Sequence, residues 1–194
     1  IYSVGEAGYK LLRSKKKLPA DVPFDRVDVI SSHSRVHMMA VNDFRIQLVL
    51  TEKIVPDLKI HFLSPNSPFV ARRQDGRTLV NEQFSVNATD KTPIRYTPDG
   101  VFAMHCCRLK KTLLFFLEID RATESLGSET GYKNNIRQKI LNYQVTYKLK
   151  QYKRYESIFG SRLKGFRLLL VSRSGHLAKL SKVLAESPPS EFIH

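Results

Sequence analysis

The sequence predicts an α/β fold in which a mixed central sheet lies between helices. The predicted order is a helix, at least three strands, a second helix, a further strand and a closing helix, which is the pattern of a layered α/β domain. The run from Leu113 to Leu117 has no polar residue and predicts a strand that is buried on both faces. With 194 residues and 42% hydrophobic content, the chain can bury a core of one domain.

The amino-terminal part predicts little more than one helix. Residues 1–17 read as a short strand, a glycine-containing turn and a brief amphipathic helix that ends in a basic cluster, and the stretch from Pro19 to Pro23 reads as a linker. A segment of this size cannot form a core of its own. It is either a terminal appendage or the tail of a domain whose beginning precedes Ile1.

The first helix of the main domain is predicted from Ser34 to Val55. Ser34 is a suitable N-cap, and Pro56 stops the helix. Apolar residues recur there at the three- and four-residue spacing of a helix: Val36, Met39, Ala40, Phe44, Leu48 and Val55. His37 lies one turn inside this helix, where a histidine bonded near the core and a site residue are equally good interpretations.

Four strand-like segments follow this helix. Leu58 to Leu63 predicts a strand, and residues 64–76 predict a loop with two prolines. Leu79 to Val86 is either another strand or irregular. Two more strands are predicted at about residues 100–107 and 112–120, and a polar connection covers residues 124–132.

The second half of the chain predicts helix, strand and helix. A long helix is expected from about Asn134 to Tyr152, with an apolar stripe that consists of Ile136, Ile140, Tyr143 and Tyr147. Phe166 to Val171 predicts a buried strand, and a closing helix runs from Ser174 or Gly175 to about Ala185.

Acidic residues gather where two of the predicted strands meet. Asp99 precedes the strand at 100–107, and Glu118 and Asp120 close the strand at 112–120. The two-residue period of a strand places Glu118 and Asp120 on one face. Neighbouring carboxylates repel each other unless a cation or a basic ligand neutralises them. Two structural alternatives stay open: an ordinary Pro-Asp-Gly turn with a strand end, and an ion pair with Arg121.

Such a cluster suits a divalent cation. Carboxylate and carbonyl oxygens are the ligands that Mg²⁺ and Mn²⁺ prefer, and these ions promote phosphodiester hydrolysis by polarising a phosphoryl oxygen. The predicted metal ligands are Asp99 and Glu118, with the carbonyl of Ile119 as a third. A nearby lysine would orient the attacking water or offset charge at phosphorus.

The net charge of +14 and the pI near 9.9 predict a polyanionic partner, with nucleic acid ahead of an anionic membrane. The predicted nucleic-acid contacts are Arg121, Lys133, Arg137, Lys148, Lys150 and Lys153. No acid interrupts the sequence between Glu129 and Glu156, although a solvated face remains the alternative. The sequence contains no glycine-rich phosphate loop and no His/Cys metal cluster. It shows no apolar run of membrane-spanning length and no visible signal peptide, so we expect a cytoplasmic protein.

The motifs together resemble a known family. Pro98-Asp99, followed nineteen residues later by Glu118-Ile119-Asp120, resembles the PD-(D/E)XK nuclease pattern. More narrowly, the chain resembles the bacterial replication-relaxation family of plasmids and mobile elements. The matching pieces are Ile1-Tyr2-Ser3-Val4, His37 with Val41-Asn42-Asp43, the block from Phe116 to Glu124, and Lys139 with Tyr143.

This resemblance implies a winged helix followed by a restriction-endonuclease-like domain with a mixed central sheet. Residues 1–18 would be the tail of the truncated winged helix, and residues 24–187 the nuclease-like domain. Asp120 stands where the wider nuclease class has lysine, and related folds move that lysine to the following helix, where Lys139 could serve.

The resemblance implies a DNA-binding protein of plasmid replication or mobilisation that acts as a Mg²⁺- or Mn²⁺-dependent nickase or endonuclease. Its catalytic residues would be Asp99, Glu118, Asp120 and Lys139, and its partners would be DNA and other replication or mobilisation proteins. The alternative is a catalytically inactive DNA-binding accessory protein that uses the same fold as a scaffold.

Overall fold

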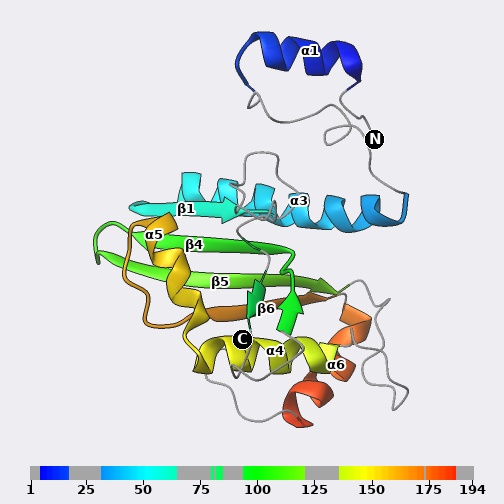
Figure 1. Cartoon of the computed structure of the whole chain (residues 1–194), viewed down its shortest axis with the longest axis vertical. Helices are drawn as coiled ribbons and strands as arrows, with labels where there is room; N and C mark the ends of the chain where they lie inside the picture. Colours follow the sequence, from blue (N-terminus) through cyan, green and yellow to red (C-terminus); the bar gives the residue numbers. More distant parts are fainter. Residues whose placement is uncertain are drawn as a thin grey trace.

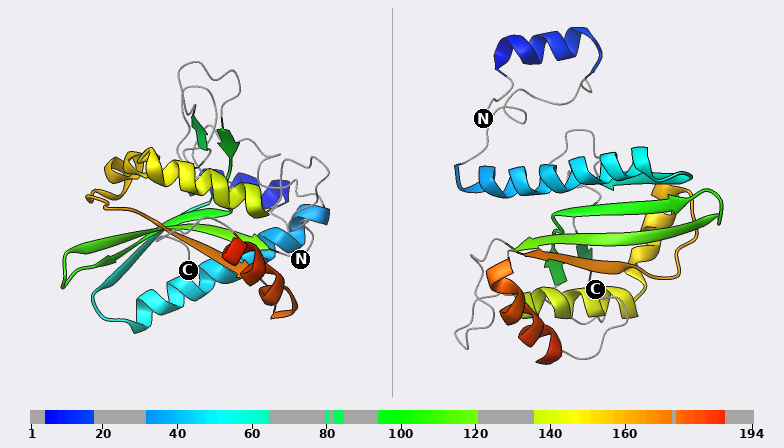
Figure 2. Two further views of the ribbon diagram at one scale, coloured as in Figure 1. Left: turned by 90° about the horizontal axis from the view of Figure 1, so that it is seen from below. Right: turned by 180° about the vertical axis from the view of Figure 1, so that it is seen from behind.

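The computed structural model describes residues 5–17, 32–64, 80, 82–84, 94–120, 136–172 and 174–186. Within these ranges the chain forms a mixed sheet with helices on both of its faces (Figures 1 and 2). The elements are α1 (Glu6–Ser14), α3 (Ser32–Ile54), β1 (Leu58–Leu63), β2 (Glu82–Phe84), β3 (Ile94–Tyr96), β4 (Gly100–Cys106), β5 (Lys111–Asp120), α4 (Ile136–Lys148), a 3-10 turn η1 (Gln151–Tyr155), α5 (Glu156–Phe159), β6 (Arg167–Ser172) and α6 (Ser174–Glu186).

The main sheet has the strand order β1-β4-β5-β6. The first three strands form an antiparallel meander, and β6 pairs in parallel with β5. Parallel pairing requires a crossover connection, which α4, η1 and α5 provide. Leaving the β2–β3 hairpin aside, the order is helix, three strands, helix, strand and helix, as the sequence predicts.

The face of the sheet that carries α4 holds the larger core. Leu114 and Phe116 of β5 lie beside Val101 of β4 and pack against α4 and η1. The ring of Tyr143 is fully buried there, with its centroid 5.4 Å from that of Phe116. The amino-terminal half of α4 packs on α6 through a smaller cluster of Ile136, Ile140 and Leu180.

The opposite face carries α3 and is built on aromatic side chains. Phe102 of β4 stacks on Phe115 of β5 at a centroid distance of 4.7 Å, and Phe62 of β1 stacks on its other side at 6.1 Å. Phe44 of α3 covers Phe102 at 5.7 Å. Opposed stacked and tilted rings of this kind add to the stabilisation from burial alone.

The helix predicted from Ser34 to Val55 is confirmed as α3, although several of its apolar residues are exposed. Val41 is buried and Phe44 contacts the sheet, whereas Val36, Met39 and Val55 are 52%, 47% and 42% exposed. Val55 also falls beyond the last helical residue. The spacing therefore predicts the helix but not which of its apolar residues are buried, because α3 has apolar residues on more than one side.

The second helix is shorter than predicted. It ends at Lys148 rather than near Tyr152, and Lys150 adopts a left-handed conformation with φ of 54°. The chain then continues as η1 and α5. The predicted stripe is confirmed in its first three members: Ile136, Ile140 and Tyr143 are buried.

Two further expectations concern short or undescribed segments. The predicted strand at 79–86 contains β2, which among the described strands pairs with β3 alone. The predicted amino-terminal helix is present as α1, which lies apart from the sheet in Figure 1 and buries none of its side chains. The strand expected in residues 1–4, the linker at 19–23 and the connection at 124–132 lie outside the described residues.

Candidate functional site

Asp99 lies in the bend that leads into β4. Its backbone N–H donates to the carbonyl of Leu117 at 3.0 Å, and this hydrogen bond fixes the position of the bend relative to β5. Its Oδ2 accepts a hydrogen bond from the backbone N–H of Ile119 at 2.7 Å, and its Oδ1 lies 2.7 Å from Nε2 of His37 on α3. At the start of β4, the Asp99 carboxylate therefore accepts the hydrogen bond that the backbone of a longer strand would accept, and His37 of α3 contacts its other oxygen.

Glu118 lies near the end of β5 with its side chain on the α4 face. The side chain is only 5% exposed, which is rare for glutamate unless it is paired. Both carboxylate oxygens have partners on α4: Lys139 Nζ donates to Oε2 at 2.9 Å, and the hydroxyl of Tyr143 donates to Oε1 at 2.6 Å. One turn of α4 thus holds Glu118 by two charge-assisted hydrogen bonds.

The two carboxylates are electrostatically coupled. Burial raises the pKa of the Glu118 carboxyl from 4.5 to about 7; the ammonium of Lys139 and the hydrogen bonds from Tyr143 and Lys139 act against this rise, and the negative charge of Asp99 adds to it. Burial and the charge of Glu118 also raise the pKa of Tyr143 well above 10. Near neutral pH the Glu118 carboxyl is therefore only partly ionised, so the proton and a cation compete for it.

Asp120 lies on the same face of β5 as Glu118, as the two-residue period predicts. It is 9% exposed, and Ser172 of the adjacent strand β6 donates a hydrogen bond to its Oδ2 at 2.9 Å. The structure thus ties Asp120 to β6, whereas Asp99 is tied to α3. Arg121, the alternative partner that the sequence offers, lies outside the described residues.

The donor chemistry of the site fits a hard divalent cation. Asp99 and Glu118 supply carboxylate oxygens with lone pairs beyond those already used. Because Leu117 O and Ile119 N both point toward the Asp99 segment, the carbonyl of Ile119 lies on that side as well. Among the described residues, no group of three or more His, Cys, Asp or Glu side chains is arranged to hold a metal ion. The fit therefore consists of two carboxylates and a backbone carbonyl.

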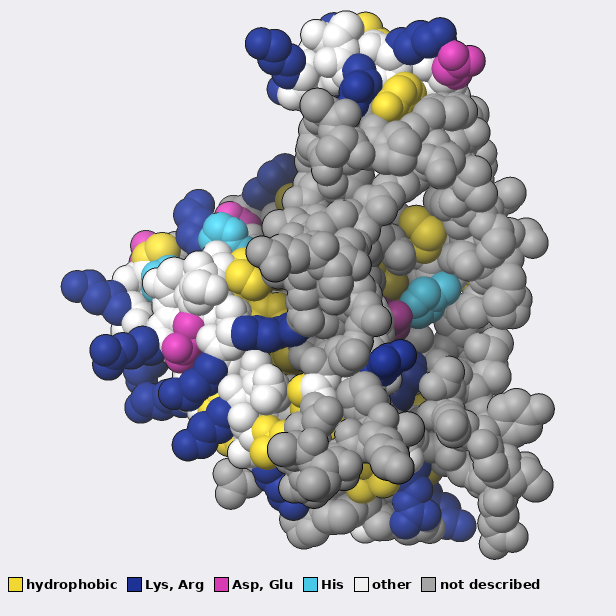
Figure 3. Space-filling view, in the orientation of Figure 1, with side chains coloured by type: hydrophobic (Ala, Val, Ile, Leu, Met, Phe, Trp, Pro, Cys, Tyr) yellow, Lys and Arg dark blue, Asp and Glu magenta, His cyan; other side chains and the backbone are white. Residues whose placement is uncertain are grey.

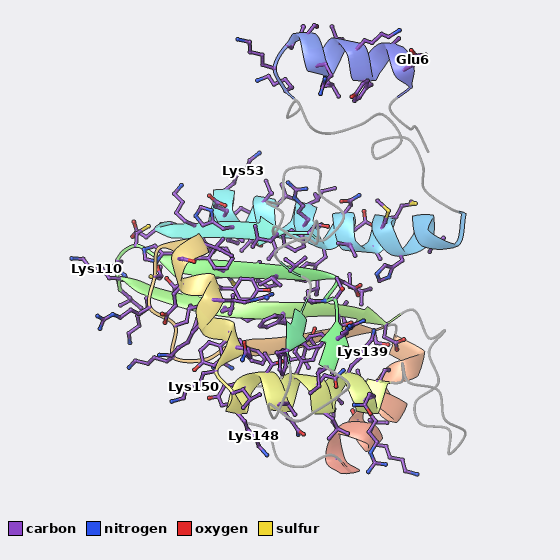
Figure 4. The ribbon with its side chains drawn as sticks, viewed as in Figure 1. Glu6, Lys53, Lys110, Lys139, Lys148 and Lys150 are labelled. Carbon is purple, nitrogen blue, oxygen red and sulfur yellow. The ribbon has the colours of Figure 1, made fainter. Side chains whose placement is uncertain are left out.

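The predicted nucleic-acid contacts are not gathered in one place. Arg137 is exposed near the start of α4, and Lys148, Lys150 and Lys153 are exposed at or after its end. Eleven residues of helix separate Arg137 from Lys148, or roughly 16 Å at 1.5 Å per residue. Figure 4 shows Lys139 at one end of the sheet and Lys148 and Lys150 toward the other. Arg121 and Lys133 lie outside the described residues.

Sequence reasoning missed the hydroxyl of Tyr143 as a partner of Glu118. It placed Tyr143 in an apolar stripe, although a tyrosine four residues after Lys139 lies on the same helix face and can reach the same acceptor. The contact between His37 and Asp99 spans 62 residues. No local pattern in the sequence indicates which acid this histidine would meet.

None of the helices in the described segments is both long and apolar enough to cross a membrane.

Comparisons with known proteins give one match. No curated protein and no solved structure matches the chain. A family model described as replication-relaxation matches residues 1–161, which include His37, Asp99, Glu118 and Lys139. Because this match covers well over half of the sequence, the chain belongs to the replication-relaxation family.

Proposed function

We propose that the protein acts on DNA in the replication or mobilisation of a plasmid or other mobile element, as a metal-dependent nickase or endonuclease with a PD-(D/E)XK core. The observation that supports this proposal is that Asp99, Glu118 and Lys139 all lie at the same end of the sheet. Asp99 precedes β4, Glu118 ends the apolar part of β5, and Lys139 reaches Glu118 from the following helix. The order helix, three strands, helix and strand around them supports the proposal, because it is similar to the order of the PD-(D/E)XK core.

In this proposal, Asp99, Glu118 and the carbonyl of Ile119 hold Mg²⁺ or Mn²⁺. The cation, when bound, would polarise a phosphoryl oxygen of DNA and lower the pKa of a water molecule. Lys139 orients Glu118 through its 2.9 Å hydrogen bond and offers positive charge toward the phosphate. Asp120 is a further ligand or a positioning residue, because Ser172 already fixes one of its oxygens.

His37 has a positioning role in the same scheme. It lies 2.7 Å from Asp99 Oδ1 and leaves Oδ2 to the backbone of β5. The His37 contact therefore fixes the rotamer of Asp99 from the α3 side of the sheet. Residues 1–18 are in this proposal the tail of a winged-helix domain, residues 24–187 form the nuclease-like domain, and the protein is cytoplasmic.

A second candidate function is DNA binding without cleavage. One observation favours it: each oxygen of Glu118 and of Asp99 already has a donor within the protein. A network that is satisfied internally can be purely structural. In that case the basic residues carry the function through phosphate contacts, and the affinity is salt-dependent and largely independent of sequence.

A plasmid assay separates the two candidates. Supercoiled plasmid is incubated with the protein and Mg²⁺, Mn²⁺ or EDTA, and nicked and linear products are resolved on a gel. We expect metal-dependent nicking that Asp99→Asn, Glu118→Gln and Lys139→Met each abolish while DNA binding persists. Asp43→Asn, an exposed aspartate on α3, is the matched control and should cleave normally. Binding without metal-dependent cleavage by the unmodified protein would contradict the nuclease proposal and leave the second candidate.

A further inference from the structure

A cavity of about 820 Å³ lies at the end of the sheet opposite the carboxylates. Its walls are the turn between β4 and β5, the first residues of β5, the end of α4 and the segment between α5 and β6. Lys111 at this end and Glu118 are seven residues apart on β5, or roughly 23 Å at 3.3 Å per residue. The cavity is therefore separate from the candidate metal site.

Positive charge dominates the walls of this cavity, which we call the basic cavity. Its exposed cationic residues are Lys110, Lys111, Arg162, Lys164 and Arg167. Of the described residues that line it, none is Asp or Glu. Dark-blue side chains gather along the corresponding edge of the molecule in Figure 3, and Figure 4 shows Lys110 at the tip of the β4–β5 turn. Several like charges around one concave surface strengthen the local potential for an anion.

The protein neutralises little of this charge itself. In the part of the chain that the structure describes, Lys110, Lys111, Arg162 and Lys164 take part in no ion pair. The nearest acid in sequence to Arg162, Glu156, accepts a hydrogen bond from the backbone N–H of Leu163 at 2.8 Å and does not line the cavity. An external anion can therefore approach these cations without displacing an internal one.

The basic cavity also offers apolar surface. Leu113 lines it and is 51% exposed, although it belongs to the central strand of the sheet. The partly exposed ring of Tyr147 forms another part of the wall and packs across Gly165, where a Cβ atom would lie 3.0 Å from the ring. A volume of this size suits a ligand of one or two nucleotides, and apolar and aromatic side chains accept nucleobases.

We propose that the basic cavity binds a single-stranded segment of nucleic acid, with phosphates at Lys111, Arg162 and Lys164 and a base against Tyr147. A strand fits better than a free nucleotide because two further exposed lysines, Lys148 and Lys150, lie at the end of α4, next to Tyr147 in the cavity wall (Figure 4). The inference rests on the proposed association with DNA, but not on cleavage.

The test is a binding titration with a labelled oligothymidylate of about 20 nucleotides, followed by fluorescence anisotropy at several salt concentrations. The cavity variant combines Lys111→Gln, Arg162→Gln and Lys164→Gln. The control variant combines Lys15→Gln, Arg45→Gln and Lys53→Gln, which removes the same charge from exposed positions on or next to α1 and α3. All six residues are exposed, and thermal melting checks that each variant is folded.

Loss of three phosphate contacts should reduce the slope of log binding constant against log salt concentration by about 2, at ~0.7 per contact for single strands. A fourfold rise in salt concentration should then lower the oligonucleotide affinity of the unmodified protein by a factor roughly 16-fold greater than that of the cavity variant. The control variant should keep the slope of the unmodified protein. Equal slopes in the cavity and control variants would overturn the inference, and so would equal competition by free thymidine monophosphate and by the oligonucleotide.

The outcome is independent of the nuclease test. If the unmodified protein binds no oligonucleotide at all, both the basic cavity as a strand site and the proposed association with DNA fail. If the unmodified protein binds the oligonucleotide and the cavity variant binds it with the same salt dependence, the association with DNA stands and the basic cavity is not its site. Cleavage by the cavity variant under saturating DNA should continue, because the carboxylates lie roughly 23 Å away.

Discussion

The burial of Glu118 predicts that the protein loses stability as the pH rises toward neutrality. The pKa of this carboxyl is raised from 4.5 to about 7 on folding, mainly by burial. A carboxyl whose folded pKa exceeds its unfolded pKa contributes its full stabilisation below the unfolded value and loses it as the pH rises through the folded value. The window is therefore pH 4.5 to 7, and 2.5 pH units correspond to roughly 3 kcal/mol of unfolding free energy.

The perturbation that isolates this effect is Glu118→Gln, because glutamine keeps the shape and the hydrogen-bond acceptor for Tyr143 but does not titrate. Urea unfolding at intervals between pH 5 and pH 8 gives the free energy of unfolding for both proteins. We expect the difference, unmodified minus variant, to fall by most of this ~3 kcal/mol across the range. The contributions of titrating groups that do not interact with Glu118 are the same in both proteins and cancel in the difference.

Two results would refute this reasoning. A difference that stays constant with pH would mean that Glu118 has the same pKa in the folded and unfolded chains. A difference that rises with pH would mean that Lys139 and Tyr143 stabilise the ionised carboxylate by more than burial costs. The control is Glu6→Gln on α1, which makes the same substitution at a side chain that is 68% exposed.

Three further predictions concern the same region. Mn²⁺ affinity, measured by calorimetry, should rise up to about tenfold per pH unit below pH 7 because the ion displaces the Glu118 proton, and a pH-independent affinity would contradict this. Tyr143→Phe should lower the free energy of unfolding in urea by about 1–3 kcal/mol, and by more at pH 8 than at pH 5, because the Tyr143 hydroxyl donates to the ionised Glu118 carboxylate. Tyr152→Phe is the control: it loses a hydrogen bond to the Lys164 carbonyl, and its cost should be the same at pH 5 and at pH 8. Gly100→Ala should cost about 1–3 kcal/mol because its methyl group meets the Phe62 ring and moves it off Phe102, and an unchanged thermal midpoint would show that the ring yields freely.

Local patterns were enough to predict the order of the elements, but not their ends. The apolar run from Leu113 and the stripe through Ile136 and Ile140 have one simple periodicity each, and both elements are present. The end of α4 depends on a left-handed lysine at position 150, a conformation that sequence favours only for glycine and asparagine. The sequence contains no signal for this break.

The candidate site likewise contains some features that local sequence patterns predict and others that they do not. Glu118 and Asp120 share a face because the strand period requires it, and Lys139 reaches Glu118 as the family resemblance implies. The contact of His37 with Asp99 depends on how α3 crosses the sheet, which is set by the packing of Phe44 on Phe102. Tertiary packing of this kind cannot be read from spacing along one chain.

The parallel pairing of β5 with β6 has a practical consequence for shortened versions of the protein. Glu118 is opposite Leu170, more than fifty residues later, so the interior strand β5 acquires its second neighbour only from the end of the chain. A fragment that stops before Arg167 would expose the backbone edge of a strand rich in leucine and phenylalanine, and such edges invite intermolecular strand addition. Expression designs should therefore extend beyond Ser172, or they will produce insoluble material for a reason unrelated to activity.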